Sequence, residues 1–153
     1  IIIDADAISL FKGFEKEFYN LLKTKEKIII TPHFGEFKRV FNFISMSKID
    51  MCIEASKLIN NCVLLKGNDT VIAFPNDKIW INNLANNNLA TAGTGDLLCG
   101  ILAGLLAQNM DFSYAILASV WIQSRISKSK NDVVVEDFLK QIPFVIDSLK
   151  KNN

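Results

Sequence analysis

Cysteine, histidine and proline are scarce in this chain. The 153 residues include three cysteines, three prolines and one histidine. The cysteine count is odd, and Cys52, Cys62 and Cys99 lie in apolar surroundings without metal-ligand spacing, so we expect no disulfide framework. Reduced cysteines in a core are typical of a cytoplasmic protein, and we predict that location.

The chain also lacks an excess of charge of either sign. Seventeen lysine and arginine residues face sixteen aspartate and glutamate residues, which leaves a net charge of +1. This balance provides no broad basic surface for nucleic acid or for anionic lipid. We therefore expect neither nucleic acid nor a membrane as a partner.

The chain has no long hydrophobic run. The longest, Leu97 to Ala107, has eleven residues, well short of the ~18 that indicate a membrane span, and it predicts a buried helix. Asp4 and Asp6 interrupt the apolar start of the chain, and no basic residue precedes it, so a secretion signal is not expected. With 50% hydrophobic and 22% charged residues, the composition predicts a compact domain with a core.

Short β-branched runs alternate with longer segments of helical periodicity, which is typical of an α/β layer fold. Near-continuous apolar strands suit a parallel sheet covered by helices on both faces. Two further strands around the Pro75-Asn76-Asp77 turn predict an antiparallel hairpin at one edge. The expected strands are 1–3, 27–30, 62–65, 70–74 and 78–81.

Helical periodicity predicts helices over 35–43, 50–59, 94–108, 113–127 and 135 to about 150. Pro143 is expected to kink or split the last of these, because proline lacks the backbone N–H of a helix interior. A further helix is expected to start near Asp4 to Ala7. Since Ile1 to Ile3 reads as a strand already under way, we expect the chain to begin inside a larger fold.

The strongest chemical signal is the run from Ala92 to Asp96, Ala-Gly-Thr-Gly-Asp, which opens an apolar helix. Glycines let the backbone approach a ligand, and a helix start presents unpaired N–H groups that favour phosphate. Asp96 beside that site could accept a proton from a hydroxyl that attacks a phosphoryl group. Alternatively, Asp96 only complements the helix dipole, while Gly100 and Gly104 permit close helix packing.

Other polar residues follow the predicted strands. His33 lies where the second strand ends, and ligands of open α/β sheets gather beyond such ends. Asp4 and Asp6 follow the first strand, where Asp6 could cap a helix and Asp4 could form a polar wall of a site. Lys66 to Thr70 follow another strand and offer a lysine and a hydroxyl to phosphate.

Four segments in the same order resemble the ADP- or ATP-dependent NAD(P)H-hydrate dehydratase family, a branch of the ribokinase-like superfamily. They are Ile3 to Ala7, Ile30 to Phe37, Leu65 to Ile72, and Leu89 to Asp96. The resemblance implies an α/β fold, a ribokinase-like three-layer αβα sandwich with a mostly parallel sheet and an edge hairpin. It also implies that residues 1–153 form a single partial domain, the rear part of the family's domain, with the N-terminal part absent.

The family's activity is the repair of NADHX and NADPHX, nicotinamide cofactors hydrated on the reduced ring. In the reaction that the resemblance implies, the ring hydroxyl is phosphorylated, phosphate leaves, and ADP becomes AMP and phosphate; some members use ATP instead. Two alternatives stay open. One is a ribokinase-like kinase for a small alcohol, and the other is a truncated relative that binds adenine nucleotide without catalysis.

The resemblance also implies roles for individual residues. Asp96 corresponds to the catalytic base and to a contact with the hydrated nicotinamide, and His33 corresponds to another contact with that substrate. Glu36 would help arrange Mg²⁺ and its waters, although capping of the following helix explains it nearly as well. The residues that correspond to adenine-nucleotide contacts are Lys66, Gly67, Asn68, Asp69, Thr70 and Gly95.

Two positions depart from the family pattern, and both lie next to the predicted pocket. Phe34 stands where a proline is usual, and Asn86, Asn87 and Asn88 stand where a Gly-Asn-Pro-Gly-like stretch is typical.

An incomplete sheet would leave an exposed edge that invites pairing. We therefore expect a homo-oligomer.

Overall fold

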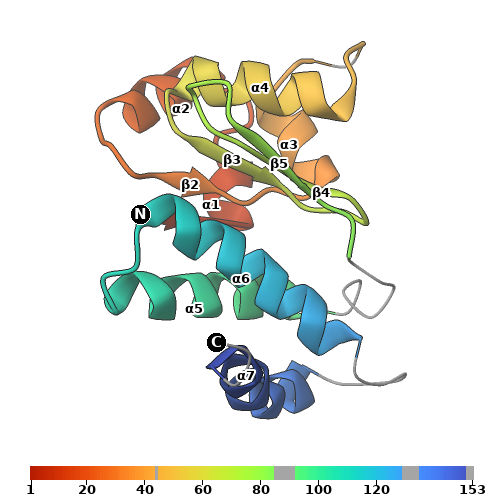
Figure 1. Cartoon of the computed structure of the whole chain (residues 1–153). Coiled ribbons are helices and arrows are strands. Elements are labelled where there is room, and N and C mark those ends of the chain that lie inside the picture. The colour runs from red at the N-terminus through yellow and green to blue at the C-terminus, as the bar shows by residue number, and fades with distance from the viewer. Residues whose placement is uncertain (44, 85–91, 129–134, 151–153) are drawn as a thin grey trace. The chain divides into compact units, whose positions relative to one another are not determined.

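The computed structural model describes residues 1–43, 45–84, 92–128 and 135–150. The chain divides into two compact units, Ile1–Asn83 and Leu84–Asn153, each with its own elements (Figure 1). That residues 1–153 act as one partial domain stays a prediction. In the described part of the chain, no helix combines the length and the apolar character that a membrane crossing needs.

The first unit contains a five-stranded mixed sheet in the order β1-β2-β3-β4-β5. β1, β2 and β3 run parallel, whereas β4 is antiparallel to both β3 and β5. The parallel part and the edge hairpin are therefore confirmed, and the antiparallel β3–β4 pair adds a second hairpin. The strands are β1 (Ile2–Ile3), β2 (Ile29–Ile30), β3 (Cys62–Leu65), β4 (Thr70–Ala73) and β5 (Ile79–Asn82).

Helices connect the parallel strands, because two parallel neighbours require a crossover. α1 (Asp6–Ser9) and α2 (Glu15–Lys23) lie between β1 and β2, while α3 (Phe34–Val40) and α4 (Lys48–Ile59) lie between β2 and β3. α2 was not predicted from the sequence. This helix follows Phe14 without a side-chain cap, so the usual signal for a helix start is missing.

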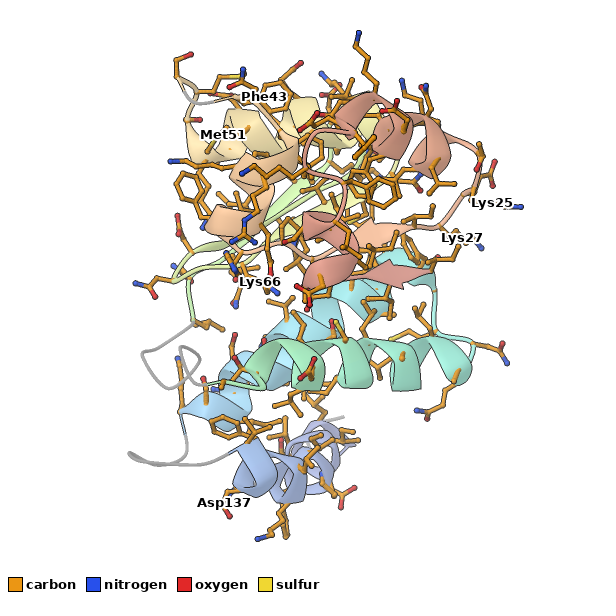
Figure 2. The ribbon with its side chains drawn as sticks, turned by 180° about the vertical axis from the view of Figure 1, so that it is seen from behind. Lys25, Lys27, Phe43, Met51, Lys66 and Asp137 are labelled. Atoms are coloured by element: carbon orange, nitrogen blue, oxygen red, sulfur yellow. The ribbon has the colours of Figure 1, made fainter. Side chains whose placement is uncertain are left out.

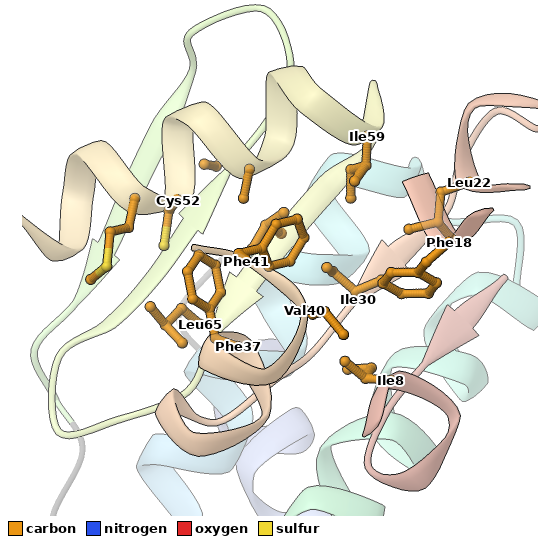
Figure 3. Close-up of a cluster of buried hydrophobic side chains, with 14 of the residues drawn as sticks. Ile8, Phe18, Leu22, Ile30, Phe37, Val40, Phe41, Cys52, Ile59 and Leu65 are labelled. Atoms are coloured by element: carbon orange, nitrogen blue, oxygen red, sulfur yellow. The ribbon is translucent and has the colours of Figure 1, made fainter. Parts of the chain in front are cut away.

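The core of the first unit lies between α2, α3, α4 and the sheet (Figure 3). Phe18, Phe37 and Phe41 are buried there, whereas Phe14 is 60% exposed and does not belong to the core. Strand residues whose side chains point to the other face of the sheet are buried too. The central strands therefore carry apolar side chains on both faces. These residues are Ile29, Cys62, Leu64 and Ile72.

The second unit contains α5 (Thr94–Ala107), α6 (Phe112–Ser127) and α7 (Val135–Lys150). Asp111 caps α6 by accepting hydrogen bonds from the N–H groups of Ser113 and Tyr114. An apolar core joins the three helices around Leu97, Ile101, Ile122, Ile126 and Phe138.

Pro143 was predicted to kink or split the last helix; α7 continues through Pro143, so it does not split. Proline removes one N–H from the helix ladder, the one that would pair with the carbonyl of Leu139. Both residues are exposed, and water can take the place of the missing donor at that position.

Candidate functional site

Three polar residues follow the three parallel strands of the first unit. Asp4 follows β1, and His33 follows β2 after Thr31 and Pro32. Lys66, which Figure 2 labels, follows β3. Because parallel strands end at the same edge of a sheet, these residues are brought together there. Their role in binding a ligand stays a prediction.

Lys66 connects the three loops. Its Nζ lies 2.7 Å from Oδ1 of Asp4 and 3.9 Å from Oε2 of Glu36. Its backbone N–H donates to the carbonyl of Pro32 at 2.8 Å. The side chains of Lys66, Asp4 and Glu36 are only 23%, 15% and 9% exposed. The cluster is therefore a partly buried ionic network rather than a set of surface charges.

His33 and Glu36 form a capping box at the start of α3. The N–H groups of Gly35 and Glu36 donate to His33 Nδ1 at 2.9 and 3.2 Å, and the His33 N–H donates to Glu36 Oε2 at 2.8 Å. Because Nδ1 accepts hydrogen bonds, the ring proton is assigned to Nε2, which lies 3.3 Å from Glu36 Oε1. The ring is fixed on one side and 55% exposed, so its other edge is open to a ligand.

Gly35 explains why the imidazole fits in this position. A Cβ atom at Gly35 would lie 2.7 Å from His33 Cε1, so any larger residue would displace the ring. The capping role of Glu36 is thus present in the structure. Asp6, in contrast, does not cap α1; the N-cap is Ala5, and Asp6 is already the first helical residue.

The predicted nucleotide-binding stretch, Lys66 to Thr70, joins β3 to β4. The Thr70 hydroxyl donates to the Gly67 carbonyl at 3.1 Å and closes the turn. Gly67 is not among the residues with positive φ, so the turn does not need glycine for its backbone conformation. Asn68 and Asp69 are exposed.

A lysine that the sequence analysis did not identify lies against this stretch. Nζ of Lys48, from α4, is 2.8 Å from Asp69 Oδ1. This hydrogen bond lowers the pKa of the Asp69 carboxyl. The pair joins residues 21 positions apart, and no local pattern signals a contact that only the fold creates.

The start of α5 provides the second candidate group, in the second unit. Gly93 is the N-cap with a φ of 84°, a left-handed conformation that favours glycine. Because the N-cap is a glycine, it makes no side-chain hydrogen bond to the helix start, and the N-terminus of a helix favours an anion. Asp96 lies in the first turn and is exposed. Gln123 of α6, also missed by the sequence analysis, donates to the Thr94 carbonyl at 2.6 Å and anchors this turn.

A cavity of about 910 Å³ begins at Gly93 and Asp96 and continues along α5 to Gln108. Apart from the adjoining residues and backbone of α5, no atom of the described residues lies within 4 Å of where a Cβ would stand at Gly100 or Gly104. The interpretation of these two glycines as close helix-packing residues is therefore wrong, because both line the cavity. The rest of its lining is apolar and comes mainly from α5 and α7, including Leu97, Ile101, Leu139, Ile142 and Ile146.

Part of the predicted site is not among the residues that the structure describes. Leu89 to Thr91 and Asn86 to Asn88 lie outside the described residues. Phe34 is described, and the Lys38 ammonium lies over its ring, 4.3 Å from the ring centroid. Among the described residues, no three histidine, cysteine, aspartate or glutamate side chains gather as a metal centre.

Comparison with known proteins places these features in a family. The family model for NAD(P)H-hydrate dehydratase matches residues 1–141. The bifunctional NAD(P)H-hydrate repair enzyme Nnr of Gloeobacter violaceus is 34% identical over 79% of this chain and 23% of its own. The ADP-dependent (S)-NAD(P)H-hydrate dehydratase of Bacillus subtilis is 33% identical over 86% of this chain and 46% of its own.

A solved structure agrees with this relationship. The ADP/ATP-dependent NAD(P)H-hydrate dehydratase from Bacillus subtilis, co-crystallized with ATP/Mg²⁺ and soaked with CoA, superimposes with a TM-score of 0.78 at 26% identity. The match covers 96% of this chain and 55% of that one, so this chain spans about half the length of that relative. The α/β fold is thus ribokinase-like, and the chain belongs to the NAD(P)H-hydrate dehydratase family.

Proposed function

We propose that this chain takes part in the nucleotide-dependent dehydration of NADHX and NADPHX to NADH and NADPH. The start of α5 carries the proposal, because Gly93 in a left-handed conformation begins the helix and Asp96 of its first turn lines the cavity. The names of the relatives support the same substrate and an adenine nucleotide.

In the proposed reaction, Asp96 accepts the proton of the ring hydroxyl as the hydroxyl oxygen attacks the terminal phosphorus of the nucleotide. With ADP, the bond to the bridging oxygen breaks and AMP leaves. The phosphorylated ring then loses phosphate, together with a proton from the neighbouring carbon, and the ring double bond forms. Phosphorylation is needed because hydroxide is a poor leaving group. The enzyme is therefore a carbon–oxygen hydro-lyase.

The remaining residues bind and position the reactants in this proposal. The backbone N–H of Gly95 binds the terminal phosphate, and residues 66–70 bind the nucleotide. The exposed edge of the His33 imidazole contacts the hydrated nicotinamide. Its Nε2–H is already close to Glu36, so the contact is to the open ring face or to the carbon edge.

Mg²⁺ is proposed to arrive with the nucleotide. Direct coordination by Glu36 does not fit, because its oxygens already accept from His33 and lie near the Lys66 ammonium. Mg²⁺ usually keeps several waters and is bound through substrate phosphates. Glu36 therefore supports His33 and Lys66, and its predicted metal role is restricted to contacts through water.

Two further proposals concern the setting of the protein. We propose a cytoplasmic location, where the nicotinamide cofactors of metabolism occur. We also propose a homo-oligomer, because the edge strand β5 exposes Trp80 and Ile81 to 36% and 51%, and an apolar edge strand favours pairing. Light scattering of the purified protein tests the second proposal, and a monomer at all concentrations would contradict it.

The function is tested by incubating the purified chain with NADHX and either ADP or ATP, and by following the near-ultraviolet absorbance of NADH. Recovery of NADH that requires a nucleotide supports the dehydratase, and the preferred nucleotide answers the ADP or ATP question. Phosphorylation of a small alcohol without NADH recovery would select the kinase. Nucleotide binding without either reaction would select the binding-only alternative, which gains weight because the chain spans 46% of the Bacillus subtilis relative.

A further inference from the structure

Lys48 occupies a position that the helix itself disfavours. It is the first residue of α4, where the positive end of the helix dipole opposes a cation. The helix start is already completed by Ser47, whose Oγ accepts from the Asp50 N–H at 3.2 Å. Lys48 is therefore not needed to begin the helix, and its partners lie elsewhere.

Those partners are in the turn between β3 and β4. Lys48 Nζ donates to the carbonyl of Asp69 and, at 2.8 Å, to its Oδ1. The ammonium also lies against Gly67, where a Cβ would be only 2.7 Å from Nζ. The side chain of Lys48 is 22% exposed, whereas that of Asp69 is 62% exposed.

Asp69 is an unexpected residue in a stretch that is proposed to bind a nucleotide. A carboxylate repels the phosphates of the ligand, and the hydrogen bond from Lys48 lowers the pKa of this carboxyl so that it stays ionised. An ammonium at hydrogen-bond distance offsets that repulsion. It also fixes the turn through the Asp69 carbonyl.

We propose that Lys48 is a positioning residue of the nucleotide site, which neutralises Asp69 and holds the 66–70 turn in the shape that accepts phosphates. The inference rests on the proposed function only in taking this turn as a nucleotide contact; it does not require the dehydration step. A purely structural role for Lys48 would not depend on the charge of Asp69, and this difference is measurable.

The test is a double-mutant cycle on the Kd of ADP, measured by calorimetry on the full chain. Lys48→Met is expected to weaken ADP binding about tenfold, because the Asp69 charge is left uncompensated near the phosphates. Asp69→Asn is expected to tighten binding about threefold. The double variant should bind within about threefold of the wild type, and Lys48→Arg should retain most of the affinity.

The chain provides a matched control on the same helix. Lys57 forms an equivalent pair with Asp77, at 2.7 Å between Nζ and Oδ1, away from the 66–70 turn. Lys57→Met should leave the Kd of ADP unchanged, and thermal unfolding of each variant checks that it is folded.

Each outcome decides the matter. If the wild type binds ADP and Lys48→Met binds it equally well, or if Asp69→Asn does not restore binding to Lys48→Met, the positioning role is wrong while the proposed function stands. If ADP binding follows the expected cycle but NADHX is not dehydrated, the proposed function fails and the role of Lys48 remains. A wild type that does not bind ADP overturns both.

Discussion

The ammonium of Lys66 and the carboxylate of Asp4 lie 2.7 Å apart, although 62 positions separate them in the sequence. Lys66 follows β3 and Asp4 follows β1, so the ion pair spans the end of β2 between them. Glu36 approaches the same ammonium to 3.9 Å. One lysine thus sits between two carboxylates at the edge where the three parallel strands end.

Removal of the Lys66 ammonium should destabilise the protein. Lys66→Met leaves Asp4 and Glu36 close to each other in a partly buried setting without the cation between them. We expect the free energy of unfolding to fall by about 2 kcal/mol, which is less than for a fully buried pair because the side chains retain some exposure. Urea denaturation followed by circular dichroism measures the change.

Lys57→Met is the control for this experiment, since its partner Asp77 is exposed. The exposed pair should contribute much less to stability than the Lys66 pair, because water screens it. If both variants lose the same free energy of unfolding, the ionic network of Lys66, Asp4 and Glu36 has no special importance for stability.

Asn61 is a buried polar residue whose amide is fully engaged. Its Oδ1 accepts from the Ile28 N–H at 2.9 Å, and its Nδ2 lies within 3.3 Å of the carbonyl oxygens of Leu22, Lys25 and Ile59. Asn61→Asp replaces the donor by an acceptor, so the three carbonyls would face a buried charge. The free energy of unfolding should fall by about 3 kcal/mol.

Asn60→Asp is the neighbouring control. Asn60 is the C-cap of α4 in a left-handed conformation and is exposed, and aspartate tolerates this conformation. Its only expected penalty is a negative charge at the helix end, of about 0.3 to 1 kcal/mol. If Asn60→Asp costs as much as Asn61→Asp, the hydrogen bonds of Asn61 do not explain its effect.

The ionisation of Asp69 reports on Lys48. The hydrogen bond from Lys48 lowers the pKa of Asp69 below its ordinary value of 3.8, so this pair stabilises the protein above that pH. The contribution is lost as the pH falls through the lowered pKa. In Lys48→Met, the pKa of Asp69 should return towards its ordinary value, which carbon-detected NMR titration of the carboxyl measures. An unchanged pKa in the variant would mean that Lys48 does not hold this carboxylate in solution.

Much of the fold could be predicted because its signals are local. The apolar strand Cys62–Leu65 and the Pro75-Asn76-Asp77 turn are visible in a few consecutive residues, and α5 and α6 were placed within a residue or two. Pro143 shows the limit of such rules. One missing N–H does not split a helix when the affected carbonyl lies near solvent.

The site was predicted less completely because its contacts depend on the fold. His33 and Lys66 were identified from motifs, but the motif does not show that His33 also caps α3. Asn61 belongs to an Asn-Asn pair that resembles an ordinary turn, and its hydrogen bonds reach residues up to 39 positions away. Lys48 and Gln123 act on residues of the predicted site from other helices, and single-sequence patterns contain no signal for such contacts.

The most direct test of the account is the Asp96→Asn variant, compared with the wild type in both ADP binding and NADHX turnover. Asp111→Asn is the matched control, because asparagine also caps a helix. If Asp96 is the general base, ADP binding persists while turnover falls by about 100-fold or more, and Asp111→Asn keeps full activity. Turnover by Asp96→Asn at the wild-type rate would contradict the mechanism.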